Sequence, residues 1–285
     1  MPLRIFDDRD RELLFIRPPR RIVSLVPSDT LNVVALGAGD RLAGRTRYCD
    51  FKDPIVAAAP VVGGTKDVDV DAVAALAPDL ILANQEENSR KHVEELIRLG
   101  LPVLVSFPKT VLAGINHLAR LARIFECGAE VVKRGYEAVR APPPPSPVRT
   151  FVPIWMDPLM TVARETFTGD ALRFAGAENV FVDRERRYPL AADLRGAPVS
   201  PPGERDTRYP RITLDEVVAA APSLVLLPDE PHPFTEADAE VFRALDIPAA
   251  KSGKVRLCGG RDLSWYGAQS IEGIGRLRAL IDSLR

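Results

Sequence analysis

Short apolar runs recur along the chain, separated by longer stretches in which apolar residues return with helical spacing. The runs are rich in Val, Ile and Leu, which is typical of strands buried on both faces of a parallel sheet. The stretches between them have the pattern of amphipathic helices. The alternation predicts an α/β fold with strands at 22–26, 42–44, 80–82, 103–106, 150–155, 179–182, 224–226 and 255–257.

One helix and strand pattern occurs twice. Asp71–Leu82 reads D-A-V-A-A-L-A-P-D-L-I-L, and Asp215–Leu226 reads D-E-V-V-A-A-A-P-S-L-V-L, with identical residues at seven of twelve positions. Leu99–Pro102 and Leu245–Pro248 are a weaker second pair with nearly the same offset. A duplicated lobe explains both pairs, and chance similarity between two Ala-rich units is the alternative. Duplication predicts two equivalent units, with their strands in separate sheets.

The stretch between the two copies is helical from Thr110 to Arg140, with a break expected near Gly128, and it ends in the proline-rich run Pro142–Pro147. We expect it to connect the lobes. The predicted organisation is an N-terminal α/β lobe at 1–109, a helical connector with a Pro-rich tail at 110–147 and a C-terminal α/β lobe at 148–285. The fold class is α/β, with two similar three-layer lobes, mostly parallel sheets and a long helical connector.

Charge and composition limit the classes of binding partner that the sequence favours. The 285 residues include 38 Lys and Arg against 39 Asp and Glu, a net charge of −1, which does not favour nucleic acid or an anionic membrane. No apolar run is long enough to cross a membrane, and the first 21 residues are too charged for a signal peptide. The chain as written is therefore expected in the cytoplasm, or in the periplasm if a leader has been removed.

Candidate ligand-binding residues of the first lobe follow its predicted strands. Ser28 opens a helix, where it is either an N-cap or a ligand contact. The loop after 42–44 carries guanidinium and aromatic groups, which suit a flat or anionic ligand, although solvated surface charge is the alternative. The loop after 80–82 adds an amide and a carboxylate. The candidates here are Ser28, Arg45, Arg47, Tyr48, Asn84 and Glu86.

The second lobe offers its own set. Trp265 and Tyr266 are either a stacking platform or the anchor of the last helix. The segment 183–210 contains Arg-Tyr-Pro twice and is longer than an ordinary loop, which makes it functional or disordered. Its role stays open. The candidates of this lobe are Trp155, Asp157, Arg164, Glu230, His232, Trp265 and Tyr266.

Two alternatives to simple ligand binding exist. His232 with Asp229 and Glu230 offers acid and base groups for a cytosolic enzyme, but the chain lacks a nucleophile elbow, a phosphate loop and a GxGxxG motif. Cys49 with His232 offers a metal site that needs further ligands. Cys49, Cys127 and Cys258 are widely spaced without a CxxC, so neither a disulfide framework nor a zinc cluster is indicated.

Several segments resemble the class III substrate-binding proteins of ABC transporters, a family with cobalamin-, heme- and siderophore-binding members. The resemblance implies two α/β lobes bridged by a long helix, a ligand held between them with little hinge motion, and an ABC transporter permease as partner. It implies no cofactor other than a corrinoid or metal chelate bound as ligand. The segments are Arg20–Ser28, Gly37–Gly44, Val62–Gly64, Ala77–Leu82 and Gly176–Phe181.

This chain departs from that family at three positions. Asn84 and Met160 stand where cobalamin binders have aromatic side chains, and Arg90 stands where the first lobe has a carboxylate that docks on the transporter. The leading hypothesis is a non-enzymatic binding protein that holds a metal chelate, a corrinoid or a similar mid-sized polar ligand. No membrane insertion and no nucleic-acid partner are expected.

Overall fold

The structure is a computed structural model that describes residues 2–49, 52–140, 142–144 and 146–285. The chain divides into two compact units. The first comprises 1–108, 112–137 and 265–271, and the second comprises 109–111, 138–264 and 272–285. Among the described residues, no helix has the length and apolar character needed to span a membrane.

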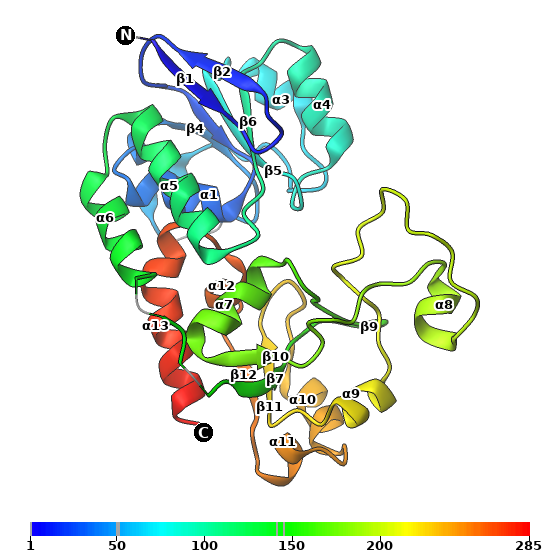
Figure 1. Ribbon diagram of the computed structural model, residues 1–285. Helices are drawn as coiled ribbons and strands as arrows, with labels where there is room; N and C mark the ends of the chain where they lie inside the picture. Colours follow the sequence, from blue (N-terminus) through cyan, green and yellow to red (C-terminus); the bar gives the residue numbers. More distant parts are fainter. Residues whose placement is uncertain (1, 50–51, 141, 145) are drawn as a thin grey trace. The chain divides into compact units, whose positions relative to one another are not determined.

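The first unit is built on a four-stranded parallel sheet of order β4-β3-β5-β6 (Figure 1). Leu80 and Leu82 on β5 pack in one hydrophobic cluster, whereas Ile81 and Ala83 pack in another. Successive side chains of a strand point to opposite faces, so both faces of this sheet are covered. The strands are β3 (Ile22–Ser24), β4 (Leu42–Arg45), β5 (Leu80–Asn84) and β6 (Val103–Ser106).

The second unit repeats this plan with a parallel sheet of order β10-β7-β11-β12. Leu224 and Leu226 on β11 belong to one hydrophobic cluster, and Val225 and Leu227 belong to the other. The sheet is therefore also buried on both faces. The strands are β7 (Val148–Phe151), β10 (Ala177–Asn179), β11 (Leu224–Pro228) and β12 (Val255–Cys258).

The repeated pattern occupies equivalent places in the two units. The copies are α3 (Val70–Ala75) followed by β5, and α9 (Leu214–Ala220) followed by β11. Each strand is third in the order of its own sheet. Ala77 and Ala221, which precede the matched prolines, both adopt left-handed backbone, with φ of 43° and 45°. The prediction that the two strands lie in separate sheets is confirmed.

The helical stretch between the copies is interrupted where the sequence predicts. Gly128 has a φ of +80°, and a Cβ there would lie 2.4 Å from Leu36 Cδ2. A residue with a side chain would meet both backbone strain and a clash at this point. The two resulting helices are α5 (Val111–Phe125) and α6 (Ala129–Ala138), and both pack on the core of the first unit through residues such as Leu118 and Val131. Most of the expected connector is thus part of the first unit.

Two further predictions are corrected. The expected strand at 150–155 is divided between β7 and β8 (Pro153–Met156), and β8 pairs instead with β9 (Leu159–Thr161) in an antiparallel hairpin. Ser28 is not an N-cap, because α1 (Pro27–Ala35) already begins at Pro27, with Val26 as its N-cap. Proline is well suited to the first helical position, where its missing N–H is not needed.

The remaining elements complete the layers. β1 (Leu3–Phe6) and β2 (Glu12–Phe15) form an antiparallel hairpin. The others are η1 (Gly39–Arg41), α2 (Pro54–Ala58), α4 (Arg90–Arg98), α7 (Phe167–Ala175), α8 (Leu190–Arg195), α10 (Glu236–Arg243), α11 (Pro248–Lys251), α12 (Arg261–Ser264) and α13 (Ala268–Asp282).

Candidate ligand-binding edges

Ligands of open α/β sheets bind beyond the carboxyl ends of the parallel strands. We therefore consider the loops that follow the strands of each sheet, one unit at a time. In the first unit, the loop after β4 presents Tyr48, whose side chain is 56% exposed. The Arg47 guanidinium lies 5.8 Å from the centre of the Tyr48 ring. A flat ligand could stack on the aromatic face of Tyr48.

The two arginines of this loop have different surroundings. Arg47 makes a two-pronged ion pair with Asp67, with N–O distances of 3.0 and 2.8 Å, and these hydrogen bonds lower the pKa of the Asp67 carboxyl. Arg45 points inward, where its Nε donates to the carbonyl of Val56 at 2.7 Å. Arg45 therefore stabilises the carbonyl end of α2, and Arg47 is the arginine that faces solvent.

Asn84 shapes the loop after β5. Its Oδ1 accepts from the backbone N–H groups of Glu86 and Glu87, at 2.8 and 3.1 Å, and its Nδ2 donates to Ser106 Oγ at 3.2 Å. Only 3% of Asn84 is exposed. Its amide thus has protein partners on both sides. Glu86 is half-buried, and its carbonyl accepts from the Lys66 ammonium group.

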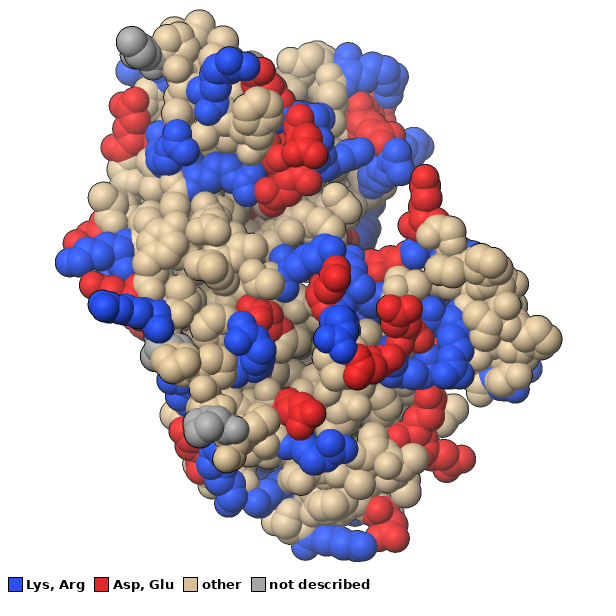
Figure 2. All heavy atoms as spheres, viewed as in Figure 1, with Lys and Arg blue, Asp and Glu red and all other residues tan. Residues whose placement is uncertain are grey.

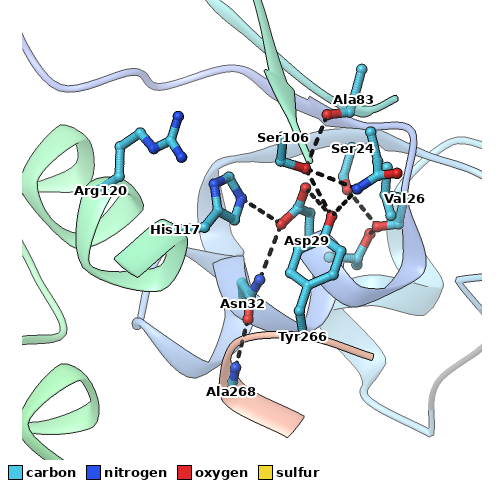
Figure 3. Close-up of polar contacts among 12 residues, drawn as sticks. Ser24, Val26, Asp29, Asn32, Ala83, Ser106, His117, Arg120, Tyr266 and Ala268 are labelled. Carbon is cyan, nitrogen blue, oxygen red and sulfur yellow. Dashed lines mark hydrogen bonds and ion pairs between the residues drawn. The ribbon is translucent and has the colours of Figure 1, made fainter. Parts of the chain in front are cut away.

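A buried polar network lies behind these loops in the same unit (Figure 3). Asp29 Oδ1 accepts from His117 Nε2 at 2.9 Å and from Asn32 Nδ2 at 3.0 Å, and Oδ2 accepts from the Tyr266 hydroxyl at 3.0 Å. The Asp29 and His117 side chains are fully buried. Asp29 is in the first turn of α1, where the helix dipole favours a negative charge. The donors and the helix together compensate this buried carboxylate.

The Tyr266 hydroxyl is the junction of the network. It lies 3.0 Å from Ser106 Oγ and 3.4 Å from Asn84 Nδ2, as well as donating to Asp29. Burial, and then the nearby charge of Asp29, raise the pKa of Tyr266 well above 10. The phenol therefore stays protonated and keeps its role as a donor.

The network holds a distant part of the chain in the first unit. The backbone N–H of Ala268 donates to Asn32 Oδ1 at 2.8 Å, and Gly267 is so close that a Cβ would lie 2.3 Å from the same oxygen. Trp265 and Tyr266 are only 8% and 5% exposed. Of the two interpretations of this pair, the anchor is the one that the structure supports. An exposed stacking platform is wrong, because the Tyr266 hydroxyl is bonded inside the unit.

In the second unit, three aromatic rings gather after the ends of β7 and β11. The Trp155 and His232 rings are 5.3 Å apart at 62°, and the His232 and Phe234 rings are 4.6 Å apart at 72°. Trp155 is 44% exposed, and its Nε1 donates to the carbonyl of Asp157 at 3.0 Å. Trp155 is thus held by Asp157 while part of its face is open to a ligand.

The acidic neighbours of His232 bond to a different segment. Asp229 Oδ1 accepts from the backbone N–H of Gly260 at 2.6 Å, and Glu230 Oε1 accepts from Ser264 Oγ at 3.1 Å. Asp229 thus holds the residue before α12, and Glu230 holds the last residue of α12. The His232 ring is instead surrounded by aromatic groups, which is a poor arrangement for an acid and base pair.

Two other candidates have clear surroundings. Arg164 is paired with Asp183, and it lines a cavity of about 470 Å³ in the second unit together with Lys109, Thr166 and Asp170. Cys49 is buried, with its Sγ 3.0 Å from Thr30 Oγ1.

The metal alternative finds no support in the part of the chain that the structure describes. Burial raises the pKa of the Cys49 thiol, which disfavours the thiolate that binds metal. Within the described ranges, no three His, Cys, Asp or Glu residues are grouped as metal ligands would be. Cys49 and His232 belong to different units.

Comparison with known proteins agrees with this architecture. Residues 22–140 match the family described as periplasmic binding protein. A vitamin B12-binding protein of Yersinia pseudotuberculosis is 29% identical over 182 residues, which are 61% of this chain and 65% of the relative. The chain is similar to these proteins over part of its length. It spans less than two thirds of the length of the relatives it matches in sequence.

Solved structures share the fold of this chain. The periplasmic vitamin B12-binding protein BtuF of Vibrio cholerae has a TM-score of 0.73 at 18% identity, covering 94% of this chain and 98% of its own. The periplasmic heme-binding protein RhuT of Roseiflexus sp. RS-1 has a TM-score of 0.68 at 17% identity, covering 93% and 99%. The predicted α/β fold of two similar units is confirmed.

Proposed function

We propose that this protein binds a metal chelate, a corrinoid or a similar mid-sized polar ligand without transforming it. The relatives named above bind vitamin B12 and heme, which are flat conjugated metal complexes. The observation that carries the proposal is the partly exposed Trp155, with the His232 and Phe234 rings beside it, at the carboxyl edge of a parallel sheet. Aromatic faces at such an edge suit a flat ligand.

The first unit supports the same proposal. Tyr48 presents an exposed ring at its sheet edge, and the paired Arg47 next to it supplies hydrogen-bond donors for a carboxylate or phosphate substituent. Asn84 acts indirectly by holding the loop that carries Glu86. Asp229 and Glu230 bond to Gly260 and Ser264, at the two ends of α12, rather than to a reacting group, which favours binding over catalysis.

We further propose that the protein works outside the cytoplasm and hands its ligand to an ABC transporter permease. The two solved proteins named above are periplasmic, which favours the periplasmic location over the cytoplasmic one. Arg90, at the expected docking position, is exposed and paired with Glu94 at 2.6 Å. Docking on this unit would therefore use the carboxylate of Glu94, held by Arg90.

Isothermal titration with hydroxocobalamin, hemin and a ferric catecholate tests the proposal. We expect one of the three to bind with a Kd well below 1 mM, and Trp155→Ala and Tyr48→Ala to weaken binding about fivefold each, since an aromatic contact contributes about 1 kcal/mol. Tyr136→Ala is the matched control, because Tyr136 is 42% exposed on α6, away from the sheet edges.

Absence of binding by all three chelates would refute the proposal. Equal weakening of chelate binding by Tyr136→Ala would also count against the proposal, since the aromatic groups at the sheet edges would then contribute no more to binding than an aromatic group elsewhere on the surface.

A further inference from the structure

The segment 183–211 between β10 and α9 is folded around one arginine. The Arg184 side chain is 11% exposed, and it donates to Glu216 Oε1 at 2.7 Å and to Asp193 Oδ1 at 2.9 Å. Asp193 is buried, and its other carboxylate oxygen accepts from the backbone N–H of Arg211 at 2.8 Å. A charged pair buried in this way fixes the segment, because breaking it would leave an unpaired buried charge. The segment is thus an ordered part of the second unit.

This segment folds back on itself and encloses a cavity of about 300 Å³. The backbone N–H of Arg186 donates to the carbonyl of Thr207 at 2.7 Å, and that of Ser200 donates to the carbonyl of Tyr188 at 2.8 Å. The Tyr188 hydroxyl donates to the carbonyl of Asp206 at 2.7 Å. These bonds hold the two walls of the cavity, one from 183–188 and the other from 199–207. The cavity is therefore formed in advance of any ligand.

Most of the lining charges that are not already paired within the protein are arginines. Arg184 is neutralised by Asp193 and Glu216, and Asp183 is paired with Arg164. The lining charges that remain are Arg186 and Arg187 against Glu185. Figure 2 shows basic side chains gathered over the segment beside α8.

Arg186 is held ready for a ligand. Its guanidinium lies 5.0 Å from the centre of the Tyr188 ring, which fixes its position. Its Nε is buried, and this atom has no hydrogen-bond partner among the described residues. The Nε has almost no exposed surface, so an acceptor from outside the chain would meet the rest of the partly exposed guanidinium group. An anion supplies that acceptor.

We propose that the cavity is a binding site for a small organic anion, a carboxylate or phosphate monoester on a single flat ring. The guanidinium fork of arginine matches the geometry of both groups. Val199 and Pro202 line the cavity and provide apolar surface for the ring, whereas the Tyr188 ring is covered by the Arg205 guanidinium, 4.1 Å from its centre. The volume is at the lower end for ligand sites, which fits a one-ring molecule. The site is in the segment alone and does not depend on the function proposed above.

Titration of the full chain with phenyl phosphate and benzoate, followed by ligand-observed NMR and calorimetry, tests the site. We expect one of them to bind, inorganic phosphate to bind more weakly and phenol not to bind. Arg186→Gln and Arg187→Gln should each weaken binding about tenfold or more, because hydrogen bonds to charged groups are among the strongest. Arg195→Gln is the matched control, since it removes the same charge from an exposed position of the same segment that does not line the cavity.

Arg187→Gln keeps the test decisive even if Arg186→Gln loses the fold, because the Arg187 side chain is exposed. Binding that is unchanged in Arg187→Gln, or weakened equally in Arg195→Gln, would overturn the proposal, as would the absence of binding by both ring anions. Phenyl phosphate binding without benzoate binding would identify the ligand as a phosphate ester, and the reverse would identify a carboxylate. Chelate affinity in Arg187→Gln should equal that of the unmodified protein, so the two proposals fail independently.

Discussion

Removing the Tyr266 hydroxyl isolates the contribution of the buried network. The variant Tyr266→Phe keeps the ring in place and takes one donor from Asp29 Oδ2, at a distance of 3.0 Å. Asp29 would keep His117 and Asn32 on Oδ1, while Oδ2 would lose the Tyr266 donor. A hydrogen bond to a buried charged group contributes about 1.5–3 kcal/mol. We therefore expect the free energy of unfolding of the first unit to fall by about 2 kcal/mol.

Urea unfolding followed by circular dichroism at neutral pH measures this loss, with the two units fitted as separate transitions if both are resolved. Tyr136→Phe is the control. Its hydroxyl also donates, to Asn116 Oδ1 at 2.9 Å, but in an exposed place where water can replace it. The control should stay within about 0.5 kcal/mol of the unmodified protein. Similar losses for both variants would refute the idea that the buried charge sets the magnitude.

The pH dependence gives an independent check. The pKa of Tyr266 is raised well above 10 in the folded state, whereas an unfolded tyrosine ionises near 10. Above pH 10 the unfolded chain releases this proton and the folded chain keeps it, so stability falls by about 1.4 kcal/mol per pH unit. Tyr266→Phe lacks this dependence. The stability difference between the two proteins should therefore be constant below pH 10 and shrink above it, and a constant difference up to pH 11 would contradict this.

Two backbone predictions concern left-handed positions. Gly128→Ala should lower the free energy of unfolding, measured in urea, by about 3 kcal/mol, because it combines a φ of +80° with a Cβ 2.4 Å from Leu36 Cδ2. Gly100→Ala has a similar φ but open space around the Cβ, so it should lower the free energy of unfolding by only about 1 kcal/mol. Equal losses of stability in the two variants would show that the contact with Leu36 does not contribute to the cost of Gly128→Ala. Ala77→Gly and Ala221→Gly should each leave stability unchanged or raise it by up to about 1 kcal/mol, since glycine relieves the strained φ but adds freedom to the unfolded chain. A loss of about 1 kcal/mol in either, as in a helix interior, would contradict the left-handed assignment.

The sequence predicted most of the fold because burial in a parallel sheet is a local signal. Runs such as Val103–Ser106 are apolar up to their last residue, and the structure places that strand at the same bounds. The break at Gly128 was also local, since glycine weakens a helix. The sequence predicts a single strand at 150–155 because the apolar pattern continues through Val152. In the structure, pairing with β9 separates β8 from β7, and this pairing is not visible in the local pattern.

The buried network could not be predicted in the same way. Asp29 and His117 are 88 positions apart in the chain, and Asp29 and Tyr266 are 237 apart. No periodicity connects such distant residues, and a histidine within an amphipathic helix is ordinarily a core or surface residue. The sequence pattern predicts Ser28, next to Asp29, as a helix cap, because serine is common at that position. In the structure the preceding proline is already the first helical residue.

The duplication helps to locate function within each unit. Both sheets have the same strand order and the same division of β5 and β11 side chains between two clusters, because both must bury two faces. The loops beyond the strands are free of that constraint, and there the units differ. One unit has Tyr48 with the paired Arg47, and the other has His232 between the Trp155 and Phe234 rings. Different loops at the two carboxyl edges are expected if a shared core supports different ligand contacts, and they would not be expected if those loops served only to connect the strands.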